Sequence, residues 1–135
     1  MEFHGAKVAV FIGGRVLVAL RDDFDHIPFP ECWDFAGGGR ELGESPEECV
    51  LRELKEEFGL TLISDQLVGK WAYQTTVPVG TAYFFAAHLP TGAESGVVFG
   101  EEGQRWMLMT PEEYLSRSDA IAHLQDCLRV YLERL

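Results

Sequence analysis

Three glutamates near the middle of the chain have a spacing that suits a metal site. Glu53, Glu56 and Glu57 stand at i, i+3 and i+4, so an α-helix would bring all three onto one face. At an effective dielectric constant of about 20, two like charges roughly 6 Å apart repel by on the order of 3 kcal/mol. Such a group is costly without a cation, and carboxylate oxygens suit Mg²⁺ or Mn²⁺. The alternative is a solvated charged face, which would favour Lys or Arg four residues after each Glu.

The helix that carries these glutamates has signals at both ends. Ser45 fits the N-cap, Pro46 the first helical position, and Glu48 completes a Ser-x-x-Glu capping box. Gly59 can adopt the left-handed conformation that ends a helix. Just upstream, residues 37–39 are all glycine, so backbone carbonyls or amides there can approach a metal or a phosphate. We therefore expect a glycine loop and a short helix, an arrangement that suits a pyrophosphate with its metal.

The segment from Gly38 to Leu60 resembles the Nudix box, Gly-x5-Glu-x7-Arg-Glu-U-x-Glu-Glu-x-Gly-U, where U is a bulky apolar residue. Every fixed position is matched, by Gly38, Glu44, Arg52, Glu53, Leu54, Glu56, Glu57, Gly59 and Leu60. The similarity extends to Trp-Asp-Phe before the glycines and to Gly-Gln-Arg-Trp-Met after the box. Ala36 departs from the family, because many members have Pro there, and we expect a slightly looser loop.

The resemblance implies an α/β fold, namely a single Nudix hydrolase domain over residues 1–135 with an α/β/α sandwich around a mixed β-sheet. The order of elements agrees, because strand-like runs lie on both sides of the glutamate helix and an amphipathic helix closes the chain. The expected strands are residues 7–12, 15–20, 67–77, 81–89 and 104–109, with a two-residue hairpin turn at Gly13-Gly14. We expect Thr110 to open a short helix with a capping box, and residues 119–135 to form the closing helix.

The resemblance also implies roles for individual residues. The positions that match the family's metal ligands, three carboxylates and one backbone carbonyl, are Glu53, Glu56, Glu57 and Gly37. Arg52 matches the arginine that orients a neighbouring glutamate, and Glu44 either joins the metal site or braces the loop. The general base varies between family members, and Glu53 is our candidate. A further acid, both catalytic and metal-binding, often comes from a remote loop, where Glu102 is the better match and Glu101 the alternative.

Substrate recognition is expected from residues outside the box. Arg21 follows a strand and could form a bidentate contact with a phosphate. Gly38 and Gly39 offer bare backbone to the substrate, and Phe35 is a candidate for stacking on a base, although aromatic residues on strands are more often core. Tyr73, Tyr83 and Phe85 are further stacking candidates. The loop over residues 21–31 is either a lid or base-recognition element or a plain surface connection.

The leading hypothesis is a Mg²⁺- or Mn²⁺-dependent MutT-like pyrophosphohydrolase that cuts a nucleoside triphosphate, including an oxidised one, to a monophosphate and pyrophosphate. The alternatives are hydrolysis of a nucleoside diphosphate-sugar or a dinucleoside polyphosphate, and a Nudix-fold module that senses a nucleotide without cutting it. The intact set of acids counts against the sensor.

Composition limits the partners. A net charge of −11 argues against binding polymeric nucleic acid through a basic surface. No apolar run approaches the ~18 residues of a membrane span, and the N-terminus lacks the pattern of a signal peptide. The three cysteines form no CxxC pair, so we expect reduced thiols. The sequence therefore predicts a soluble cytoplasmic protein that binds a small nucleotide, and it is compatible with a homodimer.

Overall fold

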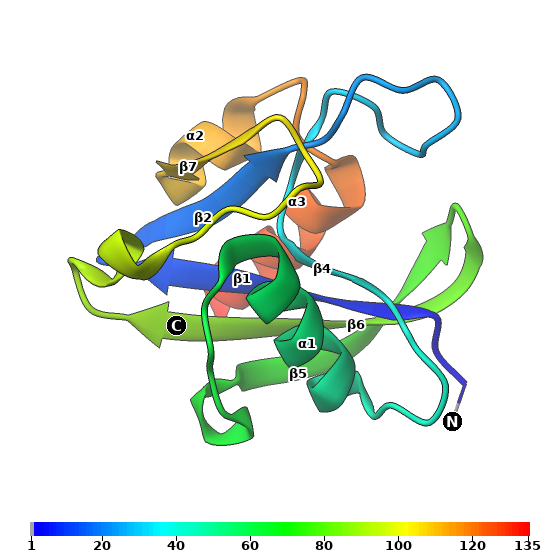
Figure 1. The fold of residues 1–135 in the computed structure, drawn as a ribbon, viewed down its shortest axis with the longest axis horizontal. Helices are drawn as coiled ribbons and strands as arrows, with labels where there is room; N and C mark the ends of the chain where they lie inside the picture. Colours follow the sequence, from blue (N-terminus) through cyan, green and yellow to red (C-terminus); the bar gives the residue numbers. More distant parts are fainter. Residues whose placement is uncertain (1) are drawn as a thin grey trace.

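Strand β1 (Gly5–Ile12) is central to a seven-stranded mixed sheet. The computed structural model describes residues 2–135 (Figure 1). One edge of β1 pairs in parallel with β6 (Val79–Leu89) along its whole length. Antiparallel β5 (Val68–Thr76) then extends the sheet beyond β6. The parallel pair is possible because the long segment between β1 and β6 contains a helix that crosses over the sheet.

The other edge of β1 is shared between two strands. Its first half pairs with β4 (Ala36–Gly39), and its end pairs with β2 (Arg15–Leu20) across the predicted Gly13-Gly14 turn. The far end of β2 pairs with β3 (Trp33–Asp34), while β7 (Arg105–Met109) pairs with β2 from Val16 to Leu20. The sheet therefore divides where β1 and β2 diverge. Strands β3 and β4, which precede the glutamate helix, occupy this gap.

Strand β4 corrects the expectation of a glycine loop, because the glycines pair with β1 as a strand. Glycine has a low propensity for strands, but here close packing overrides that propensity. A Cβ atom added to Gly37, which has a φ of 139°, would collide with the carbonyl oxygen of Ala6. A Cβ atom on Gly5 would lie 2.6 Å from the carbonyl oxygen of Gly38. The missing side chains thus let β4 lie tightly against β1 and fix its carbonyls and amides in place.

Helices cover both faces of the sheet (Figure 1). Helix α1 (Pro46–Phe58) packs Val50 and Leu54 onto one face with Val8 and Val10 of β1. Helices α2 (Pro111–Ser116) and α3 (Ala122–Glu133) pack onto the other face with the alternate residues of β1, such as Phe11. This alternation follows from the two-residue period of a strand. The predicted mixed sheet with helices on both faces is confirmed. Two short 3₁₀ turns complete the described elements, Ser64–Gln66 and Ala93–Gly96.

The ends of α1 agree with the sequence. The Ser45 hydroxyl accepts a hydrogen bond from the Glu48 backbone N–H at 3.1 Å, and the Glu48 carboxylate accepts one from the Ser45 N–H at 2.8 Å. Gly59 closes the helix in the left-handed conformation. In α2 only half of the predicted capping box forms, because the Thr110 hydroxyl accepts from the Glu113 N–H without a reciprocal bond. No helix within residues 2–135 is long and apolar enough to cross a membrane.

The cap gives a simple test of this local structure. Replacing Ser45 by Ala removes one partner of the capping box, so we expect the free energy of unfolding to fall by about 1 kcal/mol. Urea unfolding followed by circular dichroism measures the change. Thr110→Ala, which removes the simpler cap of the short helix α2, is expected to have a smaller effect. An equal or larger loss for Thr110→Ala would contradict this account of α1.

Candidate active site

Two of the three glutamates that were predicted to share a face of α1 lie against the glycine strand. The Glu57 carboxylate accepts a hydrogen bond from the backbone N–H of Gly37 at 2.8 Å. The Glu53 carboxylate lies so close to Gly38 that an added Cβ atom there would be 2.7 Å from its carboxyl carbon. Glu56 is exposed at the edge of the same face. The predicted sharing of one helical face is therefore present, and two of its members are held against the backbone of β4.

Burial changes the protonation of these two carboxyls. It raises the pKa of Glu57 to about 8, although Lys7 and the Gly37 N–H act in the opposite direction. It also raises the pKa of Glu53, against the hydrogen bond and the charge of Arg52. Within residues 2–135, no Lys, Arg or His comes close enough to Glu57 to form an ion pair. Glu57 is thus a partly buried acid for which a cation would be a favourable partner.

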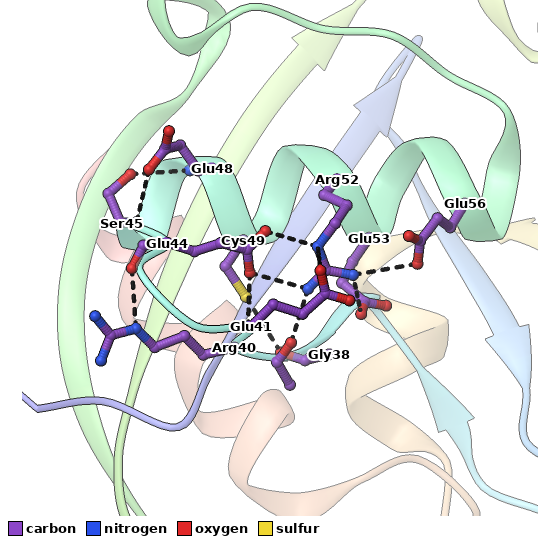
Figure 2. A network of polar contacts seen from close by, with 11 residues as sticks. Gly38, Arg40, Glu41, Glu44, Ser45, Glu48, Cys49, Arg52, Glu53 and Glu56 are labelled. Atoms are coloured by element: carbon purple, nitrogen blue, oxygen red, sulfur yellow. Dashed lines mark hydrogen bonds and ion pairs between the residues drawn. The ribbon is translucent and has the colours of Figure 1, made fainter.

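Arg52 links the remaining acids of the box (Figure 2). Its Nε donates to Glu44 at 2.6 Å, and its Nη1 donates to Glu53 at 2.9 Å and to Glu56 at 3.2 Å. Its Nη2 donates to the Gly39 carbonyl at 2.9 Å. The hydrogen bond from Arg52 is the main reason that the pKa of Glu44 is lowered. From sequence, we expected that only a cation would offset the repulsion between these acids. In the structure, Arg52 already offsets part of that repulsion.

Glu44 braces the loop before α1, which was one of the two roles expected for it; the other was to join the metal site. Besides its contact with Arg52, its carboxylate accepts a hydrogen bond from the Glu41 N–H at 2.8 Å, and its carbonyl accepts one from Arg40 Nε at 2.9 Å. These contacts tie the segment after β4 to the helix. The expectation that Arg52 orients a neighbouring glutamate stays a prediction, and the bond to Glu53 gives it a geometry.

The carboxylates suit a hard divalent cation in type and position. Glu53 and Glu57 lie at the β4 backbone, where the Gly37 carbonyl was proposed as a further ligand. No three His, Cys, Asp or Glu side chains in the described part of the chain are already grouped as metal ligands. Glu56 contacts Arg52 in this conformation, so its side chain must turn away from Arg52 to join Glu53 and Glu57. The chemistry of these carboxylates fits a hard divalent cation, and their role as its ligands stays a prediction.

Glu102 lies on a loop that is tied to the end of α1. The Gly100 N–H donates to the Glu57 carbonyl at 2.9 Å, and the Gly103 N–H donates to the Asp22 carboxylate at 3.0 Å. Glu102 is exposed and lines a cavity of about 310 Å³ that Glu57 also lines. Glu101 does not line this cavity, which supports the choice between the two acids. Their participation in metal binding stays a prediction.

A second cavity, of about 270 Å³, lies across Asp34 from the first. Gly38, Gly39, Tyr73 and His123 line it, and Arg21 and Asp34 line both cavities. Of the aromatic candidates, Tyr73 therefore lies at a cavity. Tyr83 and Phe85 lie in the core beneath α1.

Phe35 is 2% exposed and packs against Tyr114 and Phe84, although it borders the larger cavity. Its position favours core packing over base stacking. Arg21 donates from Nη1 to Asp34 Oδ2 at 3.0 Å and from Nε to the Pro28 carbonyl at 2.9 Å. These bonds hold Arg21 at the boundary of the two cavities and fix one end of the loop over residues 21–31.

Sequence reasoning missed Lys7 and Asp34. The Lys7 ammonium lies 2.8 Å from Asp34 Oδ2 and 3.4 Å from the Gly37 carbonyl oxygen. Both residues carried a signal, because a lone lysine within an apolar strand and an aspartate between Trp and Phe are unusual in a core. His123, to which the sequence analysis gives no role, also lines the smaller cavity.

Gly38 provides a specific test of the contact between β4 and α1. In Gly38→Ala the new Cβ would meet the Glu53 carboxylate at 2.7 Å, so that carboxylate must move. We expect turnover to slow by about 100-fold or more, because the candidate base Glu53 would lose its alignment. Gly96→Ala is the control, since its Cβ meets only Leu60 Cδ2 at 3.7 Å and Gly96 borders neither cavity. Equal rates in the two variants would show that the position of Glu53 is unimportant.

Comparison with known proteins points to one family. The family model of the NUDIX domain matches residues 3–128. An 8-oxo-dGTP diphosphatase of Escherichia coli is 37% identical over 76 residues, which is 55% of this chain and 56% of that protein. An 8-oxo-dGTP diphosphatase of Haemophilus influenzae is 29% identical over 76 residues, 56% of this chain and 53% of that protein. The chain thus aligns with about half the length of these relatives.

The fold agrees over a longer stretch. A MutT protein from Methanosarcina mazei superimposes with a TM-score of 0.76 at 20% identity, covering 96% of this chain and 92% of that one. This likeness concerns the fold alone. The family match extends over nearly the whole chain, and the chain therefore belongs to the Nudix family.

Proposed function

We propose that the protein is a divalent-metal-dependent pyrophosphohydrolase that cuts a nucleoside triphosphate, including an oxidised one, to a monophosphate and pyrophosphate. The observation that carries the proposal is the position of Glu53 and Glu57 against the β4 backbone: Glu57 lines the larger cavity, and Gly38, beside Glu53, lines the smaller one. The smaller cavity offers Phe29, Tyr73 and His123 to a base. The larger cavity, which Phe24, Phe35 and Phe58 also line, is bordered by acids that suit a metal-bound phosphate chain. The similarity to two 8-oxo-dGTP diphosphatases supports a triphosphate substrate.

Hydrolysis adds water across one phosphoanhydride bond. A water oxygen bonds to phosphorus, the bridging oxygen leaves with pyrophosphate, and the proton of the water must be accepted. Bound Mg²⁺ or Mn²⁺ would polarise the phosphoryl oxygens and offset their charge. We assign ligand roles to Glu53, Glu56, Glu57, Glu102 and the Gly37 carbonyl.

Glu53 is also the proposed base or water-orienting group. Its carboxylate occupies the space beside Gly38 that a side chain there would fill. Arg52 fixes one oxygen of Glu53 at 2.9 Å and leaves the other free to accept the proton of the water. Arg52 thus sets the orientation of Glu53 without itself contacting the reacting atoms.

Release of pyrophosphate and phosphate tests the proposal. The purified protein is incubated with the common nucleoside triphosphates, 8-oxo-dGTP, an ADP-sugar and a dinucleoside tetraphosphate, in Mg²⁺, in Mn²⁺ and in EDTA. We expect metal-dependent turnover with pyrophosphate as product and a triphosphate as the best substrate. Faster cleavage of the ADP-sugar or the dinucleotide would identify the alternative hydrolase. Absence of turnover on every compound in either metal would favour the nucleotide sensor.

A further inference from the structure

Lys7 has no role in the function proposed above, yet it lies at the centre of the site. Its strand contributes only buried apolar side chains from Val8 to Ile12. The Lys7 side chain is 17% exposed and lines the smaller cavity. Its ammonium reaches Asp34, the residue that separates this cavity from the larger one. Solvation of a surface does not explain a lysine in this position.

The charges around Asp34 are not balanced within the cluster. Lys7 and Arg21 both pair with one oxygen, Oδ2, at 2.8 and 3.0 Å. The other oxygen, Oδ1, is buried and has no hydrogen-bond partner among residues 2–135. Two cations thus face one carboxylate where bulk solvent screens little. The cluster carries one excess positive charge, which favours an anion beside it.

Asp22, which lines the larger cavity with Arg21 and Asp34, accepts a hydrogen bond from the Gly103 N–H. Two further acids at β4, Glu53 and Glu57, are the proposed metal ligands. The Gly37 peptide links Lys7 to these acids, because its carbonyl oxygen lies 3.4 Å from the Lys7 ammonium and its N–H donates to Glu57 at 2.8 Å. In the loaded site their charges are offset by the divalent cation. The excess positive charge of Lys7 and Arg21 then remains available to the substrate.

The smaller cavity has a lining that suits a flat heterocycle. The rings of Tyr73 and His123 stack with centroids 5.6 Å apart and planes at 29°. Phe29 meets His123 edge-on, with centroids 5.6 Å apart. Aromatic walls of this kind favour a planar ring system by contact area. A nucleoside bound there would have its first phosphate near the Asp34 cluster and the following phosphates toward Glu57.

We propose that Lys7 is a substrate-binding residue that contacts the phosphate next to the nucleoside, at the junction of the two cavities. The proposal rests on the proposed function for the nature of the ligand, a nucleotide. Asp34 positions the ammonium, and Arg21 supplies the second cation of the same subsite. The subsite fixes the direction of the substrate, with the base in the smaller cavity and the scissile phosphates at the acids of α1.

Metal-free binding separates this proposal from catalysis. Guanosine, adenosine and their 5′-monophosphates are titrated in EDTA into the wild-type protein and into Lys7→Met, Lys7→Arg and Lys70→Met. Lys70 is the matched control, because it is also a strand lysine 2.8 Å from a carboxylate, that of Glu47, but borders neither cavity. Lys7→Met leaves Arg21 to pair with Asp34, so the fold is expected to be kept, and thermal unfolding checks this.

We expect the wild-type protein to bind at least one monophosphate about 10- to 100-fold more tightly than its nucleoside, the gain typical of one charged hydrogen bond. In Lys7→Met this ratio of affinities should fall most of the way to one, with unchanged nucleoside affinity. The ratio should be partly recovered in Lys7→Arg and unchanged in Lys70→Met. Equal weakening of nucleoside and monophosphate in Lys7→Met would show that Lys7 acts only on the structure and would overturn the proposal. Absence of a phosphate-dependent gain in the wild type, or of any binding, would overturn it too. Failure of the proposed function would be seen in a separate assay, as absence of turnover in the presence of metal.

Discussion

Glu53→Gln is expected to remove nearly all hydrolysis while the fold stays intact. The amide has almost the same shape as the carboxylate, and its oxygen can still accept the hydrogen bond that Arg52 Nη1 makes at 2.9 Å. It can neither take a proton from water nor bind a metal as an anion. General-base catalysis is worth about 10²–10⁴-fold in rate, and loss of a metal ligand adds to this. We expect kcat to fall by about 10³-fold or more, measured by pyrophosphate release at saturating Mg²⁺.

The control for this variant is an acid far from the site. Glu133→Gln changes an exposed carboxylate at the end of α3, on the other face of the sheet, and should leave kcat within a factor of two. Thermal unfolding of Glu53→Gln should match that of the wild type within a few degrees. If Glu53→Gln unfolds, the glutamate is structural. If it folds and keeps more than a tenth of the activity, the base is another residue.

The parts of the site that were predictable from sequence are those encoded locally. Ser45 and Glu48 specify the start of α1 within one turn, and Gly59 specifies its end. The helical period then decides which glutamates share a face, and this holds in the structure. Local spacing and capping are short-range physics, so a single sequence displays them directly.

The parts that were missed depend on contacts between distant segments. Lys7 and Asp34 are far apart in sequence and meet only because β1 and β2 diverge and admit β3 and β4 between them. The strand character of Gly37 likewise depends on β1, since glycine alone favours a loop. The ion pairs of Arg52 with two helix acids also required the fold, because spacing shows proximity but not which rotamer is adopted.

The last prediction concerns the stability of the metal-free protein as the pH rises. Unfolded glutamate loses its proton near pH 4.5, whereas burial raises the pKa of Glu57 to about 8 in the fold. Between these values the native state holds a proton that the unfolded state has released, so stability falls as the pH increases. One pKa unit corresponds to about 1.4 kcal/mol, and the loss from Glu57 by pH 9 can reach on the order of 4 kcal/mol.

Glu57→Gln should remove this pH dependence, because the amide has no charge to bury. In EDTA at pH 9 we expect the variant to be more stable than the wild type by on the order of 2–4 kcal/mol, and at pH 5 the two should differ little.

Mg²⁺ should stabilise the wild type more at pH 9 than at pH 6, since binding favours the ionised carboxylate, and should stabilise Glu57→Gln far less. Glu56→Gln is the matched control: its carboxyl is exposed, so in EDTA its pH profile should follow the wild type. Urea unfolding at the three pH values measures these differences. If the stabilities of the wild type and of Glu57→Gln changed with pH in parallel, ionisation of Glu57 without metal would cost no stability. The argument for a cation beside Glu57 would then fail.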